Sequence, residues 1–328
     1  MKMALKSKFI CKMKLRRFLS LLFVPFISCT SNQELISCKI YSFNTISYFY
    51  LYQENKAKFN DIKSIFDLYD ELSDNYLPRG EENIFSINQK QGDVEIDEHL
   101  YDLLKKSFDV MNTATFYSPL IGSLAKKWKE SLRNKEVLSE SVILEELEKI
   151  NNSHITFLDN NVINRVGTAE LDLGGIVKGY VIDRTYEYLK DNNIKHYLIN
   201  AGNSSLLVGE KKTNNGYYNI GFKDLPNKYI KMKNCFVSTS GVSTQGVKID
   251  GVTYSHIINP YTGSAINNYD AVIVINDSGY LGDALSTSMM MNTLEEIKEL
   301  EFSLSLQTIV IKDGNVLYHH PDLKIYNH

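Results

Sequence analysis

The chain has 328 residues, of which 43% are hydrophobic and 23% are charged. These values are typical of a folded, water-facing protein that buries a large core as one big domain or two interlocked lobes. The formal net charge of −3 gives no overall positive field, so the composition offers no support for nucleic-acid binding.

Residues 1–28 are typical of a bacterial lipoprotein signal peptide. A basic segment that begins at Met13, itself an alternative start, precedes a mostly apolar run of ten residues, 18–27, too short to cross a bilayer as a helix. The run ends at Ser28-Cys29, which resembles a lipoprotein cleavage site, where the Cys becomes diacylated and N-terminal. We expect a lipid anchor at Cys29, a tether over 29–37 and an extracytoplasmic location on a bacterial membrane. The alternative is a plain signal peptide in which Cys29 has no role.

Two cysteines, Cys38 and Cys235, remain in the mature chain. Their spacing indicates neither a disulfide framework nor a zinc site. We therefore expect no essential disulfide.

The first half of the mature chain predicts a strand region followed by helices. Residues 38–52 are dense in β-branched and aromatic residues and predict a strand pair or one long strand. Helices are predicted at 56–72, after a cap at Asp97, from Ser118-Pro119 through Trp128, and at 139–150.

From His154 onward the pattern predicts short strands with two intervening helices. One helix runs to about Asp191 and the other covers 284–291, while a hairpin at 308–318 turns at Asp313-Gly314. The other predicted strands are 155–158, 162–166, 196–200, 217–222, 229–237, 252–258 and 271–276. The order of elements predicts an α+β fold with antiparallel or mixed sheets and interleaved helices.

Residues 170–183 read E-L-D-L-G-G-I-V-K-G-Y-V-I-D and predict a strand end, a turn and a helix start. Asp172 closes the strand, Gly174-Gly175 form the turn, and Lys178 lies one turn into the helix. Glycine lets the backbone approach a ligand closely, and a helix N-terminus attracts phosphate. A simple junction with a solvated lysine explains the same residues, and this stretch alone leaves both interpretations open.

Two later turns carry hydroxyl groups, a histidine and a carboxylate. Residues 238–243 read S-T-S-G-V-S and lead to 254–263, Y-S-H-I-I-N-P-Y-T-G, which contains His256. In G-D-A-L-S-T, Asp283 and Thr287 are four residues apart, so on a helix they share a face and can both offer oxygen to Mg²⁺. Taken alone, these residues favour a simpler interpretation: a helix cap, a packed threonine and a hydrogen-bonded core histidine.

Taken in order, four motifs resemble those of the FAD:protein FMN transferases, the ApbE-like thiamine-biosynthesis lipoproteins. Residues 172–180 match D-L-G-[AG]-I-A-K-G-Y, and residues 239–241 match T-S-G. Residues 256–263 match H-I-I-[DN]-P-x-T-G, and residues 283–287 match D-A-L-S-T. The resemblance spans nearly all of the mature chain and implies one large, two-lobed, ApbE-like α+β domain over 38–328.

The resemblance implies that FAD is the substrate and that it lies across the D-L-G-G stretch. Asp172 and Lys178 would contact FAD, with Ile257 against it. Tyr76, in an S-x-x-Y loop, and Phe43 would pack on the flavin.

The resemblance also implies a magnesium site and a base. Mg²⁺ would be held by the backbone carbonyl of Gly175 together with Asp283 and Thr287, and would bridge the FAD pyrophosphate. A Ser or Thr hydroxyl of an acceptor protein, a redox subunit or FMN-binding domain, would attack, so that AMP leaves and FMN becomes esterified to that side chain. His256 would take or orient the hydroxyl proton.

The sequence departs from the family on the side expected to hold isoalloxazine and adenine. The family's M-G-T reads Phe43-Asn44-Thr45, and its G-G reads Gly202-Asn203. The family's T-x-G-A-F-D-P-T-V-G-P-L aligns with residues 113–124, and the family's Gly, Asp and Thr there become Thr115, Ser118 and Leu120. The cofactor contacts implied by this alignment are Thr113, Ala114 and Thr115. Our hypothesis is that cleavage chemistry is retained while flavin affinity or acceptor choice has drifted.

Two alternatives remain beside the transferase. A Mg²⁺-dependent FAD pyrophosphatase would use water in place of the protein hydroxyl and release FMN and AMP. A lipid-anchored flavin-binding protein without turnover is the other alternative, and the intact Asp283, Thr287 and His256 argue against it. The sequence does not identify the acceptor protein.

Overall fold

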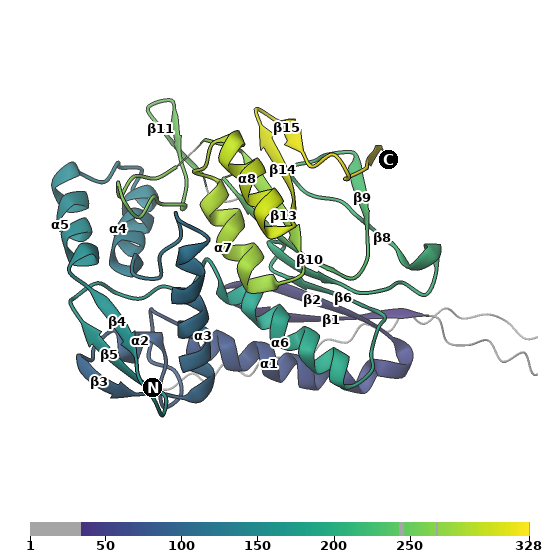
Figure 1. Ribbon diagram of the computed structural model, residues 1–328, viewed down its shortest axis with the longest axis horizontal. Helices are drawn as coiled ribbons and strands as arrows, with labels where there is room; N and C mark the ends of the chain where they lie inside the picture. Colours follow the sequence, from purple (N-terminus) through teal and green to yellow (C-terminus); the bar gives the residue numbers. More distant parts are fainter. Residues whose placement is uncertain (1–33, 243–245, 267, 328) are drawn as a thin grey trace, which may run out of the picture.

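The computed structural model describes residues 34–242, 246–266 and 268–327 (Figure 1). The predicted signal peptide and the predicted lipidation site at Cys29 lie outside these residues. The first strand begins at Leu35, three residues before the expected start of the domain at Cys38.

One eight-stranded antiparallel sheet forms the centre of the molecule. Its strand order is β1-β2-β6-β7-β10-β13-β14-β15. The strands are β1 (Leu35–Ser42), β2 (Thr45–Tyr52), β6 (Tyr197–Ala201), β7 (Ser205–Val208), β10 (Cys235–Gly241), β13 (Ala271–Asn276), β14 (Gln307–Lys312) and β15 (Asn315–His319). Every neighbouring pair in this sheet is antiparallel.

Three small antiparallel sheets surround the large one. The first contains β3 (Gly92–Glu95), β5 (Val162–Val166) and β4 (His154–Phe157), and the second contains β16 (Ile325–Asn327), β9 (Lys228–Met232) and β8 (Tyr218–Ile220). The third is a hairpin of β11 (Val247–Ile249) and β12 (Val252–Tyr254).

Eight α-helices are present in the described part of the chain. They are α1 (Phe59–Leu72), α2 (Ile84–Ile87), α3 (Glu98–Asp109), α4 (Gly122–Arg133), α5 (Glu140–Asn151), α6 (Val177–Asp191), α7 (Gly279–Met289) and α8 (Leu294–Leu304). Short 3-10 turns cover Gln53–Lys58, Val110–Asn112 and Asn214–Gly216. In Figure 1, α4, α5 and the β3–β5–β4 sheet lie to the left of the large sheet, and α6 and α7 lie across it. Together with the antiparallel sheets, these helices confirm the predicted α+β class.

Alternating side chains bury both faces of the large sheet. In β13 the side chains of Val272 and Val274 enter the main core, whereas Ile273 and Ile275 enter a second core beneath β8 and β9. A strand covered on both faces reads as a continuous apolar run, because neither face meets water. This is why the prediction of a buried strand at 271–276 is confirmed residue for residue.

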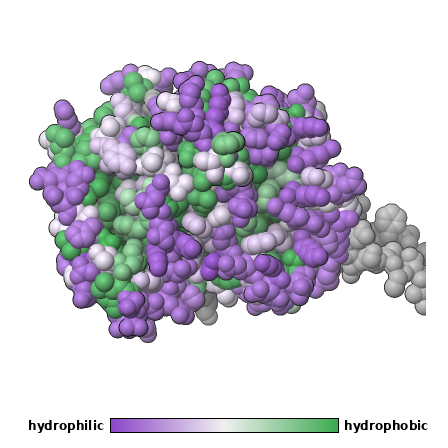
Figure 2. Space-filling model, in the orientation of Figure 1, coloured by the Kyte–Doolittle hydropathy of each residue, from purple (hydrophilic) through white to green (hydrophobic). Residues whose placement is uncertain are grey.

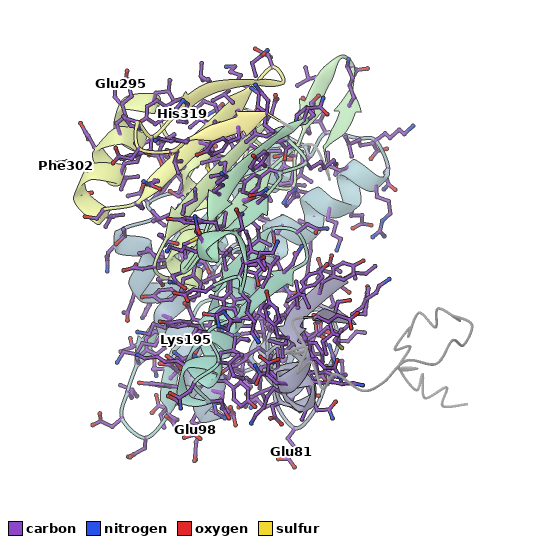
Figure 3. The ribbon with its side chains drawn as sticks, turned by 90° about the vertical axis from the view of Figure 1, so that its right-hand side faces the viewer. Glu81, Glu98, Lys195, Glu295, Phe302 and His319 are labelled. Atoms are coloured by element: carbon purple, nitrogen blue, oxygen red, sulfur yellow. The ribbon has the colours of Figure 1, made fainter. Side chains whose placement is uncertain are left out.

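The outer surface is mostly polar. Figure 2 shows hydrophilic side chains over most of one face, interrupted by smaller apolar patches. Figure 3 shows Phe302 on α8 pointing away from the molecule, and its side chain is 91% exposed. Cys38 and Cys235 do not form a disulfide. Among the described residues, no helix combines the length and apolar character needed to span a membrane.

Helices α6 and α7 cross at a pair of glycines. A Cβ atom added at Gly179 would lie 2.1 Å from the carbonyl oxygen of Gly279, so only glycine allows this approach. The Asp183 carboxylate of α6 accepts hydrogen bonds from the amides of Gly279 and Tyr280, at 2.8 and 2.7 Å. In return, the Asp283 carboxylate of α7 accepts a 2.6 Å hydrogen bond from the amide of Gly179. Each helix thereby uses a carboxylate to satisfy amides in the first turn of the other.

Several sequence predictions need correction. The predicted strand 229–237 is two strands, β9 and β10, which belong to different sheets, and Asn234 between them has φ of 48°. The predicted strand 252–258 ends at Tyr254. The helix expected from Ser118 begins at Gly122, and the helix expected from Ala284 begins at Gly279.

Candidate active site

A cleft of about 990 Å³ brings the four sequence motifs together. This volume is at the upper end of the range for small-molecule sites. Of the residues predicted to bind the cofactor or the metal or to act in catalysis, nine line it: Phe43, Tyr76, Asp172, Gly175, Lys178, His256, Ile257, Asp283 and Thr287. Segments that are far apart in the chain therefore form one site.

The turn after Leu171 is shaped by its own carboxylate. Asp172 Oδ1 accepts a hydrogen bond of 2.7 Å from the amide of Gly174, and the Asp172 amide donates to the carbonyl of Pro119 at 2.8 Å. A Cβ atom at Gly175 would lie 3.1 Å from the ring of Tyr117, so the glycine allows the turn to pack tightly. Helix α6 then begins at Val177, so Lys178 is its second residue and not one turn into the helix as predicted. The strand predicted to end at Asp172 is not formed, because residues 169–173 pair with no strand.

Two asparagines that the sequence analysis did not single out hold this turn. Asn75 Nδ2 donates to Asp172 Oδ2 at 3.0 Å. Asn88 donates to the carbonyl of Leu171 at 3.1 Å and accepts from its amide at 2.7 Å. Both come from the segment between α1 and β3, and their only sequence signal was the nearness of Asn75 to Tyr76.

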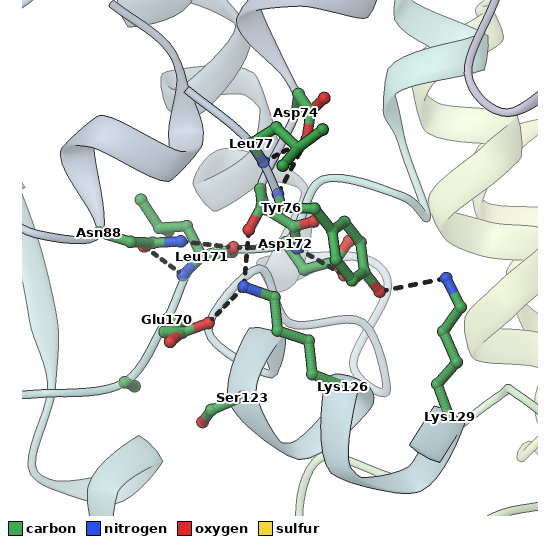
Figure 4. Close-up of polar contacts among 12 residues, drawn as sticks. Asp74, Tyr76, Leu77, Asn88, Ser123, Lys126, Lys129, Glu170, Leu171 and Asp172 are labelled. Carbon is green, nitrogen blue, oxygen red and sulfur yellow. Dashed lines mark hydrogen bonds and ion pairs between the residues drawn. The ribbon is translucent and has the colours of Figure 1, made fainter. Parts of the chain in front are cut away.

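Tyr76 lies between two lysines of α4. The ammonium groups of Lys126 and Lys129 are 5.1 and 4.6 Å from the centre of its ring, within the range of cation–π attraction. Lys126 donates to the Asn75 carbonyl at 2.6 Å. It also pairs with Glu170 at 2.7 Å (Figure 4). The Tyr76 ring is 42% exposed, so it presents an apolar surface at the edge of the cleft.

Two of the departures from the family preserve the backbone conformation that glycine favours. Phe43 and Asn44 form the β1–β2 turn with φ of 50° and 57°, and Gly202 and Asn203 form the β6–β7 turn with φ of 67° and 63°. The β1–β2 connection is a two-residue hairpin turn, which requires positive φ at both central residues, whereas the β6–β7 connection is a three-residue loop over 202–204. Asparagine tolerates positive φ better than other non-glycine residues. The turns are therefore maintained at both positions.

Asp283 is the most enclosed charged group of the cleft, with 7% of its surface exposed. Its Oδ1 accepts hydrogen bonds from Ser205 Oγ at 2.7 Å and Ser238 Oγ at 2.6 Å, and its Oδ2 accepts from the Gly179 amide. Burial raises the pKa of this carboxyl, whereas the positive charge of Lys178 and the hydrogen bonds act in the opposite direction.

Thr287 lies one turn after Asp283 on the same face of α7, as the i, i+4 spacing predicts. Its hydroxyl is 3.1 Å from Ser240 Oγ, and Ser240 Oγ is also 2.9 Å from Ser286 Oγ. A Cβ atom at Gly175 would lie 3.8 Å from Thr287 Oγ1, so the Gly174-Gly175 turn faces this helix.

The oxygen atoms of Asp283, Thr287 and Gly175 suit a hard cation. Mg²⁺ binds carboxylate, hydroxyl and carbonyl oxygen and is commonly held by only one or two carboxylates. Across residues 34–242, 246–266 and 268–327, no group of three or more His, Cys, Asp or Glu residues could hold a metal ion. Because the donors of Asp283, Thr287 and Gly175 are all oxygen atoms, they fit magnesium better than metals that prefer nitrogen or sulfur.

His256 lies in the wall of the cleft, with Ile257 beside it. Surrounding protein atoms lower the pKa of the His256 imidazole, and the charge of Lys178 lowers it further. The ring is nonetheless exposed to the cleft, whereas Ile257 is buried. Ser255 Oγ accepts a hydrogen bond of 3.1 Å from the Ile257 amide, and the Ile257 carbonyl accepts one of 2.9 Å from the Ile266 amide.

The segment 113–115 does not line the cleft. Ala114 is fully buried in the main core, and the carbonyl of Thr115 accepts a 2.8 Å hydrogen bond from the Tyr261 hydroxyl. The next three residues, Phe116, Tyr117 and Ser118, line the cleft. A cofactor contact by Thr113, Ala114 or Thr115 remains a prediction.

Comparison with known proteins identifies the family of this chain. A profile described as the ApbE family matches residues 36–309. The chain belongs to the ApbE family. The resemblance inferred from the four motifs is thereby confirmed.

Named relatives in the ApbE family are distant in sequence. An FAD:protein FMN transferase of Treponema pallidum is 24% identical over 234 residues, which cover 64% of this chain and 65% of that protein. An FAD:protein FMN transferase of Klebsiella pneumoniae is 25% identical over 250 residues, covering 72% of this chain and 76% of that protein. The match to the Treponema protein thus spans just under two thirds of its length.

Solved structures of the family share the fold. The ApbE protein of Thermotoga maritima superposes with a TM-score of 0.76 at 21% identity, covering 90% of this chain and 97% of that one. The flavin transferase ApbE of Vibrio cholerae gives 0.71 at 18% identity over the same shares of the two chains. At these identities the likeness shows that the fold is ApbE-like.

Proposed function

We propose that this ApbE-family chain transfers FMN from FAD to a Ser or Thr hydroxyl of an acceptor protein and releases AMP. The observation that carries the proposal is the convergence of Asp172, Lys178, His256, Asp283 and Thr287 on one cleft of about 990 Å³. The names of the Treponema and Klebsiella relatives support the same reaction.

The reaction breaks one phosphoanhydride bond of FAD. The acceptor oxygen attacks the phosphorus atom on the FMN side, a new P–O–C phosphoester forms, and the bond to the AMP phosphate breaks. The acceptor hydroxyl loses its proton, and AMP leaves with the bridging oxygen. No oxidation or reduction occurs.

The residues of the cleft would have different roles in this reaction. His256 is neutral at physiological pH because its pKa is lowered, so it can accept the acceptor's proton. Lys178 places a positive charge beside the pyrophosphate, at the start of α6. Asp283, Thr287 and the Gly175 carbonyl would hold Mg²⁺, which when bound neutralises phosphate charge and stabilises the leaving AMP.

The flavin would contact the aromatic side of the cleft. Tyr76 and Phe43 line that side; Phe43 lies in the β1–β2 turn and Tyr76 in the loop after α1. The exposed ring of Tyr76, fixed between Lys126 and Lys129, offers a flat surface for the isoalloxazine.

The proposal includes a membrane anchor. A diacylated Cys29, following the signal-like residues 1–28, would hold the enzyme on a bacterial membrane outside the cytoplasm. Incorporation of labelled palmitate by the wild-type chain, but not by Cys29→Ser, is the expected result, and equal labelling of the two would contradict it.

The deciding experiment uses the protein without residues 1–29, incubated with FAD and Mg²⁺, with and without an acceptor fragment that carries a Ser or Thr. AMP release together with an FMN-sized mass gain on the acceptor is expected. Asp283→Ala should lose both products, as should wild-type protein treated with EDTA. AMP and FMN release with no mass gain would instead identify an FAD pyrophosphatase, and stable FAD with no AMP would identify a flavin-binding protein.

A further inference from the structure

Two buried serines of the large sheet contact the carboxylate of Asp283. Ser205 is the first residue of β7, Ser238 lies on β10, and the two are directly opposite each other in the antiparallel ladder. Neither has any exposed surface. Both hydroxyl groups point from the same face of the sheet toward α7, because both reach the same side chain.

The two oxygen atoms of the Asp283 carboxylate have different hydrogen-bond partners. Oδ1 accepts from both hydroxyls, Ser205 at 2.7 Å and Ser238 at 2.6 Å. Oδ2 accepts from the Gly179 amide at 2.6 Å and makes a longer contact of 3.0 Å with Ser205. A carboxylate oxygen accepts about two hydrogen bonds. Ser205 has a single hydroxyl proton and lies closer to Oδ1, so Oδ1 has two donors from the sheet while Oδ2 has mainly the Gly179 amide. Oδ2 is therefore the oxygen that keeps capacity for a further partner.

The packing around the two serines leaves room for this contact. A Cβ atom at Gly282, next to Asp283, would lie 2.8 Å from Ser238 Oγ, so glycine lets α7 approach β10 at this point. Two residues further along β10, Ser240 reaches the hydroxyl of Thr287. Alternate residues of β10 thus contact both α7 side chains that are expected to bind the cation.

We infer that Ser205 and Ser238 are positioning residues that hold the Asp283 carboxylate in the orientation needed to bind a divalent cation. The inference rests on the proposed function, which places the cation at Asp283. Carboxylates that bind metals are commonly oriented by hydrogen bonds from neighbouring side chains, and losing such a partner typically costs about 10- to 100-fold in metal affinity or activity.

A purely structural role would leave the cation affinity unchanged. The Asp283 carboxylate accepts hydrogen bonds from three donors, Gly179, Ser205 and Ser238. The residue nevertheless lines the cleft together with Thr287. If the serines only neutralised a buried polar group, their removal would lower stability alone. If they position a ligand, their removal will weaken cation binding even where the fold is kept.

The test compares Ser205→Ala, Ser238→Ala and the double variant with the wild-type protein, in the chain without residues 1–29. Mn²⁺ is titrated into each protein in the presence of FAD, and free Mn²⁺ is followed by electron paramagnetic resonance. Thermal unfolding of each variant is measured in parallel. Ser47→Ala is the matched control, because Ser47 is equally buried in the same sheet but bonds only the hydroxyl of Ser42.

We expect the double variant to bind Mn²⁺ about 10- to 100-fold more weakly, each single variant to show part of that loss, and Ser47→Ala to match wild type. Wild-type Kd values in folded serine variants, or an equal loss in Ser47→Ala, would overturn the inference. If the double variant does not fold, the Mn²⁺ affinities of the two single variants test the inference instead. AMP release by wild-type protein tests the proposed function separately, since it depends on neither serine variant.

Discussion

At the scale of single residues, the surroundings of His256 determine the pH range in which it can act as a base. Burial by surrounding protein and the charge of Lys178 both disfavour the imidazolium, so the pKa of His256 lies below its ordinary value of about 6.5. A lowered pKa keeps a base deprotonated at lower pH. We therefore expect no loss of FMN transfer through protonation of His256 between pH 8 and about 6.5.

Replacing this residue tests the assignment. His256→Gln should reduce FMN transfer by roughly 10²- to 10⁴-fold, the usual contribution of a general base, with little change in FAD affinity. Initial rates and FAD titrations at several pH values provide both measurements. A fall in wild-type activity centred above pH 6.5 that is absent from His256→Gln would contradict the lowered pKa, and an unchanged rate would exclude His256 as the base.

Residue types and short spacings in the sequence identified the matched motifs, but the partners of those residues could not be identified in the same way. Asp172 and Asp283 belong to compact motifs that can be seen in one stretch. Asn75, Ser205 and Ser238 reach them across sequence separations of 97, 78 and 45 residues. Only the strand order of the sheet and the loop before α2 bring them into contact, and a single sequence does not reveal that order.

At the scale of elements, the α6–α7 crossing fixes the position of Asp283. In Gly179→Ala the new Cβ atom would lie only 2.1 Å from the carbonyl oxygen of Gly279, so the two helices would have to move apart. We expect overpacking to cost about 3 kcal/mol and to lower the melting temperature by roughly 6–12 °C. Lys190→Ala, an exposed change on the same helix, is the control. Calorimetry that found both variants as stable as wild type would contradict this account of the crossing.

The α4–α5 pair is held by a buried acid. Burial alone would raise the pKa of Glu146, but hydrogen bonds from Lys127, Lys149 and Ser123 outweigh it and lower the pKa to about 2. Because this folded-state pKa is below that of the unfolded chain, near 4.5, the stabilisation is complete above pH 4.5 and is lost as the pH falls toward 2. We estimate it at about 1–3 kcal/mol, since both lysines are partly exposed.

Glu146→Gln should therefore destabilise the protein more at pH 7 than at pH 3. Urea unfolding of the variant and the wild type at both pH values measures the difference. Glu145→Gln is the matched control, because its carboxylate pairs with the same Lys149 but has 57% of its side chain exposed. A penalty for Glu146→Gln that is equal at the two pH values would rule out the electrostatic explanation.

Elements with a strong local signal were predicted well, and errors arose where tertiary structure decides the boundary. Asp97 caps α3 through its side chain, as the sequence predicts. The prediction of one strand over 229–237 was wrong. The strand-like alternation on either side of Lys233-Asn234 looks continuous in the sequence, but the chain passes from one sheet to another at these two residues. Helix α7 begins at Gly279, five residues before the predicted start at Ala284, because the Asp183 carboxylate of α6 accepts hydrogen bonds from the first amides of α7.

At the scale of the whole molecule, β1 links the expected anchor to the cleft. Leu35 begins the strand, and Phe43, just beyond its other end, lines the cleft. Eight strand residues span about 26 Å, and the six residues from Cys29 to Leu35 can span at most about 20 Å. In the proposed anchored form, the cleft therefore lies at the end of β1 far from the tether.

This geometry predicts that anchoring does not hinder access to a soluble acceptor. Enzyme attached to lipid vesicles through a maleimide lipid on a cysteine at position 29 should modify an acceptor fragment at the rate of the same protein free in solution. A ten-residue insertion before Leu35 should change neither rate. The measurement is FMN transfer at low acceptor concentration, where the rate reports encounter as well as chemistry. If the cleft faced the membrane, attachment would slow transfer severalfold and the insertion would restore it, because a longer tether would let the acceptor reach His256 and Asp283.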